Sequence, residues 1–150
     1  MVQIRKILVC IQFNKSCKTT VPHACALAER FGAELHALHV LEASSEPDVA
    51  ALPPDEASFA SGGADLVLAG IIPPEWEERL ICQRAVTFGV PWIEITRYAW
   101  QHEIDIIVIG ASRHSAWSRW VRGSVTDQVV HHAPCPVFVI CHTERRFPLA

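Results

Sequence analysis

Apolar positions along this chain follow two patterns that alternate from one end to the other. Residues 104–109 form a short, almost continuous apolar run, typical of a strand in a parallel sheet that is covered on both faces, and residues 5–11 and 34–41 are expected to form two further strands. Residues 16–31 and 91–102 instead carry apolar side chains at helical spacing. This alternation predicts an α/β fold in which helices flank a parallel sheet.

The two long predicted helices have recognisable ends and inner faces. Gly32 supplies the C-terminal cap of the first helix, and Pro91 opens the second. We expect the buried positions to be Ala24, Leu27, Ala28 and Phe31 in the first helix and Ile95, Tyr98 and Ala99 in the second.

The middle of the chain has weaker patterns. Residues 44–54 are small, polar and interrupted by proline, which is typical of a linker. A helix is expected over 55–69, although paired glycines within it are costly. Pro73 and Pro74 are expected to end this region, and residues 79–88 alternate well enough to form a third strand.

The C-terminal third has the order of elements that builds a phosphate pocket. The strand over 104–109 is expected to stop at Gly110, which can take φ > 0 and let backbone approach a ligand. Ser124 lies near a helix start, where unpaired backbone N–H groups attract anions. Pro134 ends that helix, and residues 137–140 form a last buried strand.

These residues carry a family resemblance. Gly110-Ala111-Ser112-Arg113, nine further residues and then Gly123-Ser124 resemble the G-x2-G-x9-G-[ST] signature of universal stress proteins, and residues 123–140 look like their C-terminal block. The resemblance implies an open, parallel five-stranded sheet of order 3-2-1-4-5 with helices on both faces, Rossmann-like and similar to adenine nucleotide alpha hydrolases. It implies one domain over 1–150, with 143–150 as a C-terminal tail.

That strand order places a crevice at the carboxyl ends of strands 1 and 4. The resemblance maps a nucleotide site onto this crevice, with the backbone of Val40 meeting an adenine edge. Its residues would be Cys10, Gln12, Val40, Ile109, Gly110, Ser112, Arg113, Gly123, Ser124 and Val125.

Two of these positions depart from the family pattern. Nucleotide-binding members carry an Asp where this chain has Gln12, which lacks the charge that suits a grip on ribose hydroxyls. The second glycine of the signature is Arg113, so a side chain stands where backbone would touch phosphate. Arg113 either binds an anion through its guanidinium or is a solvated loop residue that has closed the pocket.

Three functions follow. The first is a universal stress protein, a regulatory or binding protein in stress response whose degenerate site binds ATP, with its accompanying Mg, weakly or not at all. The alternative is an ATP/AMP-binding switch in which Arg113 contacts phosphate. The second alternative is a protein-interaction scaffold that uses the loop bearing Trp117 and Trp120, with protein partners that the sequence does not name.

Catalysis and metal binding have little support in the sequence. His114 is the only nearby acid–base candidate, and no G-x4-G-K-[ST] loop or G-x-S-x-G elbow occurs, so we expect no enzyme; weak ATP hydrolysis would follow only if ATP binds. His131, His132, Cys135 and Cys141 suggest zinc by residue type. Adjacent histidines on a helix point in different directions, so no metal site is expected.

Composition limits the remaining classes. Of 150 residues, 50% are hydrophobic and 19% charged, which fits one globular domain. Every apolar run is far shorter than the ~20 residues of a membrane-spanning helix, and no secretory h-region follows the first residues, so we expect a cytoplasmic protein. The net charge of −3 argues against nucleic acid, and the six cysteines lack a C-x2-C pair and are expected to be mostly buried thiols.

The last strand predicts an oligomer. Residues 137–140 would lie at a sheet edge, where an apolar strand invites further pairing. Relatives cover this edge with a second copy of the chain, so the resemblance implies a homodimer through the last strand.

Overall fold

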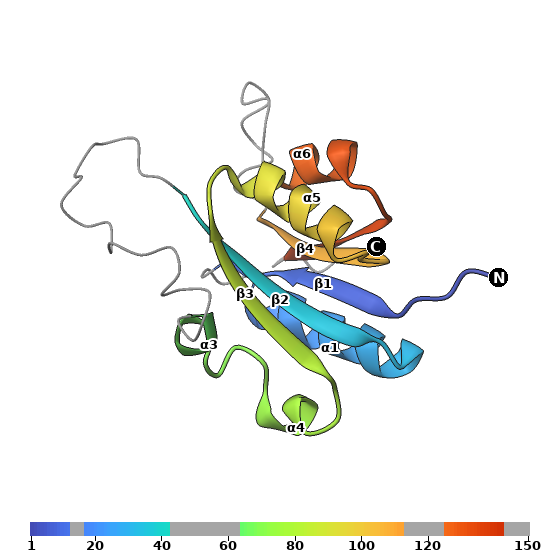
Figure 1. The fold of residues 1–150 in the computed structure, drawn as a ribbon. Helices are drawn as coiled ribbons and strands as arrows, with labels where there is room; N and C mark the ends of the chain where they lie inside the picture. Colours follow the sequence, from blue (N-terminus) through green and yellow to red (C-terminus); the bar gives the residue numbers. More distant parts are fainter. Residues whose placement is uncertain (13–16, 43–63, 113–124, 143–150) are drawn as a thin grey trace, which may run out of the picture.

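The computed structural model describes residues 1–12, 17–42, 64–112 and 125–142 (Figure 1). The elements follow one another as β1 (Lys6–Cys10), α1 (Cys17–Phe31), β2 (Glu34–Leu41), α3 (Ala64–Val67), α4 (Pro74–Glu77), β3 (Cys82–Phe88), α5 (Pro91–Gln101), β4 (Ile106–Ser112), α6 (Val125–His132) and β5 (Val137–His142). In these residues no helix is long and apolar enough to cross a membrane.

The five strands form one parallel sheet of order β3-β2-β1-β4-β5, as predicted. β1 lies between β2 and β4, with Val9 opposite Ala37 on one side and Val108 on the other. The connections change direction here, because the chain builds from β1 to β3 on one side and from β4 to β5 on the other. The carboxyl ends of β1 and its neighbours therefore lie at a switch point, where α/β proteins form ligand crevices.

Helices cover both faces of the sheet (Figure 1). Alternate strand residues point to opposite faces, so Ile7 and Val9 pack with α1 residues such as Ala24. Leu8 packs on the other face in the same cluster as Ile95 of α5 and Val129 of α6. All of these side chains are at most 3% exposed, so both faces of the central strand belong to the core.

The structure corrects the expectation that the fourth strand stops at Gly110. β4 continues to Ser112, and Gly110 is paired with Ile140 in the β4–β5 ladder. Gly110 is also not among the described glycines with positive φ. The physical reason is that β5 itself runs on to His142, so each residue of β4 up to Ser112 still has a neighbouring strand to pair with.

Two further expectations are wrong in detail. Phe31 is 47% exposed, because it is the last residue of α1; the buried positions of that helix are Thr20, Val21, Ala24, Cys25 and Ala28. Pro74 does not end the preceding region but occupies the first turn of α4, where its missing N–H costs nothing. α4 then delays the third strand, which begins at Cys82.

The predicted helix ends agree with the structure. Gly32 follows α1 with φ of 63°, the left-handed conformation of a C-terminal cap. α5 begins at Pro91, as expected, with extended Val90 before it. Of the helix expected over 55–69, the structure describes only the portion from Ala64, in which α3 is helical; residues 43–63 and the predicted tail lie outside the described residues.

Candidate functional site

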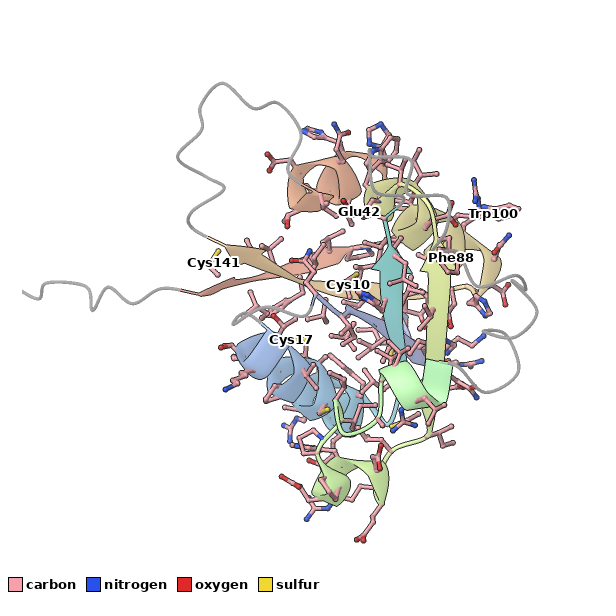
Figure 2. The ribbon with its side chains drawn as sticks, turned by 90° about the vertical axis from the view of Figure 1, so that its left-hand side faces the viewer. Cys10, Cys17, Glu42, Phe88, Trp100 and Cys141 are labelled. Atoms are coloured by element: carbon pink, nitrogen blue, oxygen red, sulfur yellow. The ribbon has the colours of Figure 1, made fainter. Side chains whose placement is uncertain are left out.

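A pocket of about 420 Å³ opens at the carboxyl ends of β1 and β2. Its walls come from the ends of both strands and from the first turns of α5 and α6. Figure 2 shows Cys10 of β1 and Glu42, which follows β2. The residues that line it are Cys10, Ile11, Gln12, Leu38, His39, Val40, Leu41, Glu42, Pro91, Ile95 and Val125.

Backbone contacts continue beyond the ends of the strands and hold the floor of this pocket. The N–H of Ile11 donates a 2.8 Å hydrogen bond to the carbonyl of Leu38, one residue past the end of β1. The Nδ1 of His39 lies 2.8 Å from the carbonyl oxygen of Ile11 and donates to it as N–H. These contacts place Gln12, which is half-buried, at the rim beside the end of β2.

The first turns of α5 and α6 form the other side of the pocket and are also held in place by local contacts. Pro91 is the first residue of α5, and Ile95, one turn later, is only 3% exposed. Val125 begins α6, and the hydroxyl of Thr126 donates a 3.3 Å hydrogen bond to the carbonyl of Gly110. This bond ties the start of α6 to β4, so that the first turns of two helices face the same pocket.

The described walls are mainly apolar, with polar groups at the rim. Leu38, Val40 and Ile95 supply aliphatic surface, and Gln12 supplies an amide that both donates and accepts. A mostly apolar cleft with few polar groups is typical of small-molecule sites. Of the described lining residues, Glu42 alone carries a fixed formal charge.

Cys10 lies in the pocket wall, but its thiol is expected to be unreactive. The side chain is 4% exposed, and burial, followed by the proximity of Cys135, raises the pKa of the Cys10 thiol to about 12. A thiol with this pKa carries almost no thiolate near neutral pH, and the thiolate is the nucleophile. Cys10 therefore contributes shape and apolar surface to the pocket.

Metal-binding side chains do not gather in the part of the chain that the structure describes. No group of three His, Cys, Asp or Glu side chains there could hold a metal ion. His132 instead directs Nδ1 to the carbonyl of Gln128, at 2.8 Å, and its ring lies 4.5 Å from that of Trp92. His131 and Cys141 are exposed.

The structure brings together only some of the predicted site residues. Four of them line the pocket: Cys10, Gln12, Val40 and Val125. Ile109 is fully buried in the core cluster on the α5 side, Gly110 belongs to the β4–β5 ladder, and Ser112 ends β4. Arg113, Gly123 and Ser124 lie outside the described residues, as does the loop with Trp117 and Trp120.

Sequence reasoning missed most of the β2 and α5 contribution. Leu38, His39, Leu41 and Glu42 surround Val40 at the end of β2, and Pro91 and Ile95 come from α5. The signal was present for β2, because the predicted strand order puts its carboxyl end beside that of β1. The α5 wall had no comparable signal, since helical periodicity identifies an inner face without saying what that face meets.

Comparisons with known proteins agree with this architecture. The profile of the Universal stress protein family matches residues 3–140. The chain is 30% identical over 126 residues to Universal stress protein MJ0531 of Methanocaldococcus jannaschii, a match that covers 79% of this chain and 71% of the relative.

Two of the solved structures that share the fold illustrate the match. A universal stress protein in complex with cAMP superposes with a TM-score of 0.70 at 14% identity, covering 95% of this chain and 100% of that one. A universal stress protein from Archaeoglobus fulgidus in complex with dAMP superposes with a TM-score of 0.60 at 18% identity, covering 93% and 98%.

Proposed function

The chain belongs to the universal stress protein family, and from this premise we propose that it is a regulatory protein of stress response that binds an adenine nucleotide weakly and does not act as a catalyst. The pocket at the ends of β1 and β2 carries the proposal. Its volume of about 420 Å³ lies in the usual range for small-molecule sites, about 300–1,000 Å³.

The apolar part of the pocket suits an adenine ring. Leu38, Val40 and Ile95 offer aliphatic surface on which a flat heterocycle can pack. Two of the structures that superpose on this chain were solved in complex with cAMP and with dAMP, which share adenine and a pentose.

Weak binding is proposed because of Gln12. This residue lines the pocket at the position where the family resemblance places an aspartate. A neutral amide forms weaker hydrogen bonds to hydroxyl groups than a carboxylate does, since charge-assisted bonds are roughly twice as strong. The loss would fall on the sugar, while the apolar contacts to the base would remain.

The test is calorimetric titration of the natural protein with Mg-ATP, beside Gln12→Asp and Arg113→Gly. We expect weak binding by the natural protein and about tenfold tighter binding by Gln12→Asp, the gain of one charge-assisted hydrogen bond. Gln12→Glu is the matched control, because it adds the same negative charge as Gln12→Asp but on a side chain that is longer by one methylene group.

Arg113→Gly separates the two nucleotide hypotheses. Tighter binding by this variant would mean that the arginine closes the site, and weaker binding would mean that its guanidinium serves the phosphates. An absence of binding in all four proteins would refute the proposed function. Equal affinity for Mg-ATP and Mg-GTP would refute adenine recognition.

We also propose that the protein is a homodimer joined through β5. β5 is an edge strand that pairs only with β4 among the described residues. Phe138 on this strand is 46% exposed. An exposed apolar edge strand favours pairing with another chain, and a second copy is the partner that closes such an edge symmetrically.

A further inference from the structure

Four polar side chains lie between β2 and α5, next to the pocket but outside its walls; His36 is buried, Glu34 and Tyr98 are partly buried and His102 is exposed. We call Glu34, His36, Tyr98 and His102 the histidine cluster. His36 is only 4% exposed, and its Nδ1 lies 2.8 Å from the hydroxyl oxygen of Tyr98. This contact joins the middle of β2 directly to the inner face of α5.

The other nitrogen of His36 is not satisfied by a hydrogen bond. Nε2 lies 3.3 Å from Oε1 of Glu34, yet it is buried without a hydrogen-bond partner in the described part of the chain. Because Nδ1 is the acceptor in the contact with Tyr98, Nε2 carries the hydrogen of the neutral ring and faces the Glu34 carboxylate. His102 completes the group, with its ring stacked on that of Tyr98 at 4.0 Å and 25°.

Hydrogen-bond directions follow from the protonation states. Burial, with Glu34 nearby, raises the pKa of Tyr98 to about 12, so the phenol keeps its proton and donates it to Nδ1 of a neutral His36. Burial lowers the pKa of His36, and the charge of Glu34 opposes this to a lesser extent. The neutral imidazole is therefore the form that fits the folded protein at neutral pH.

Protonation of His36 would change the contact with α5. Nδ1 would then carry a hydrogen, so the Tyr98 hydroxyl would have to turn and accept instead of donating. The new charge would gain from Glu34 but would face His102 and Lys6, whose Nζ donates a 3.0 Å hydrogen bond to the His102 carbonyl. β3 places uncharged Gln83 beside His36.

The histidine cluster and the pocket share both of their elements. Leu38, which lines the pocket, is two residues after His36 on the same face of β2. Ile95, which also lines the pocket, is three residues before Tyr98 on α5, less than one helical turn away. A shift of α5 at Tyr98 therefore reaches the pocket wall within one turn.

We propose that His36 and Tyr98 are positioning residues that hold α5 against β2, and that protonation of His36 loosens this contact and weakens ligand binding in the pocket. The part that concerns affinity rests on the proposed function. The part that concerns α5 does not, because it is measurable without any ligand.

The ligand-free test is an NMR titration between pH 5 and 8. We expect the ring of His36 to titrate below the ordinary value of about 6.5. The backbone amides of Ile95 and Tyr98 should shift with the same midpoint. Tyr98→Phe retains the ring but removes the hydroxyl, and in this variant the amide of Ile95 should no longer follow His36.

His23→Gln is the matched control, because His23 is an exposed histidine on α1, away from the cluster. It should leave the titration of α5 unchanged. An α5 that does not move with His36, or that moves equally in Tyr98→Phe, would overturn the proposal. These outcomes do not require a His36 variant to fold.

The affinity test uses cAMP, whose phosphodiester keeps one charge across this pH range. We expect the Kd of the natural protein to rise about fivefold from pH 7.5 to 5.5, the low end of coupling between sites. The rise should be lost in Tyr98→Phe. An unchanged Kd would overturn the coupling. Failure of cAMP to bind at either pH would also overturn the coupling. The titration with Mg-ATP at pH 7.5 would then test the proposed function separately.

Discussion

The carboxylate of Asp105 accepts a 2.9 Å hydrogen bond from the backbone N–H of Lys6, 99 positions earlier in the chain. The same oxygen accepts a 2.8 Å bond from the N–H of Arg5, and the N–H of Asp105 donates 2.9 Å to the carbonyl of Lys6. One side chain thus satisfies the backbone at the start of β1 and aligns β1 with β4.

Asp105→Ala is therefore expected to lower the free energy of unfolding by about 1–3 kcal/mol, the cost of leaving backbone donors without a charged acceptor. Asp105→Asn keeps an acceptor oxygen and should lose less. Urea denaturation of the three proteins measures both effects. Equal midpoints for Asp105→Ala and the natural protein would contradict this role.

Gly32→Ala is expected to lower the free energy of unfolding by about 1 kcal/mol. Gly32 has φ of 63°, and a Cβ built there meets no atom within 4 Å, so the cost is backbone strain alone. Gly32→Asn should cost less, because Asn tolerates the left-handed region. Thermal unfolding of both variants checks this, and a loss in Asn as large as in Ala would count against it.

Thiol reactivity should separate two cysteines that Figure 2 places at different depths. Cys141 is exposed, whereas Cys10 is buried with a pKa of about 12. At pH 8 about one Cys10 thiol in 10⁴ would be ionised. A chromogenic disulfide reagent should therefore give a fast phase that Cys141→Ser removes. Cys10→Ser should leave that phase intact, and its loss in Cys10→Ser would disprove the assignment.

Acid should destabilise the protein through His36. Because burial lowers its folded pKa, the unfolded chain binds the proton first as pH falls below about 6.5. The contribution of His36 to stability is complete above that value and declines toward the lower folded pKa, by at most about 1.4 kcal/mol per pH unit. Urea denaturation from pH 7.5 to 5 should show a smaller decline in His36→Gln, and parallel curves would refute this.

A charged residue introduced on the edge strand β5 should disrupt the proposed dimer. Phe138→Asp places charge on β5 and should yield a monomer in light scattering at micromolar concentration. Val130→Asp is the matched control, because Val130 is an equally exposed residue on α6. A monomeric natural protein, or dissociation in both variants, would refute an interface through β5.

Local patterns in the sequence determined the elements. A continuous apolar run identified the strand over 104–109, because a strand covered on both faces needs apolar side chains at nearly every position. The strand over 34–41 was also expected, although it carries His36 and His39. Gly32 and Pro91 marked helix ends through backbone preferences that belong to single residues. The strand order came from the family resemblance and was confirmed.

Only the tertiary structure decided how these elements pair, which side chains they bury and which residues line the pocket. Gly110 has the freedom to end a strand, yet pairing with Ile140 keeps it in β4. Nothing local distinguishes His36 from His39, but α5 buries His36 against Tyr98 while His39 reaches the pocket. Periodicity and capping act within a few residues, whereas burial and pocket walls depend on partners far away in the sequence, as His36 and Tyr98 are by 62 positions.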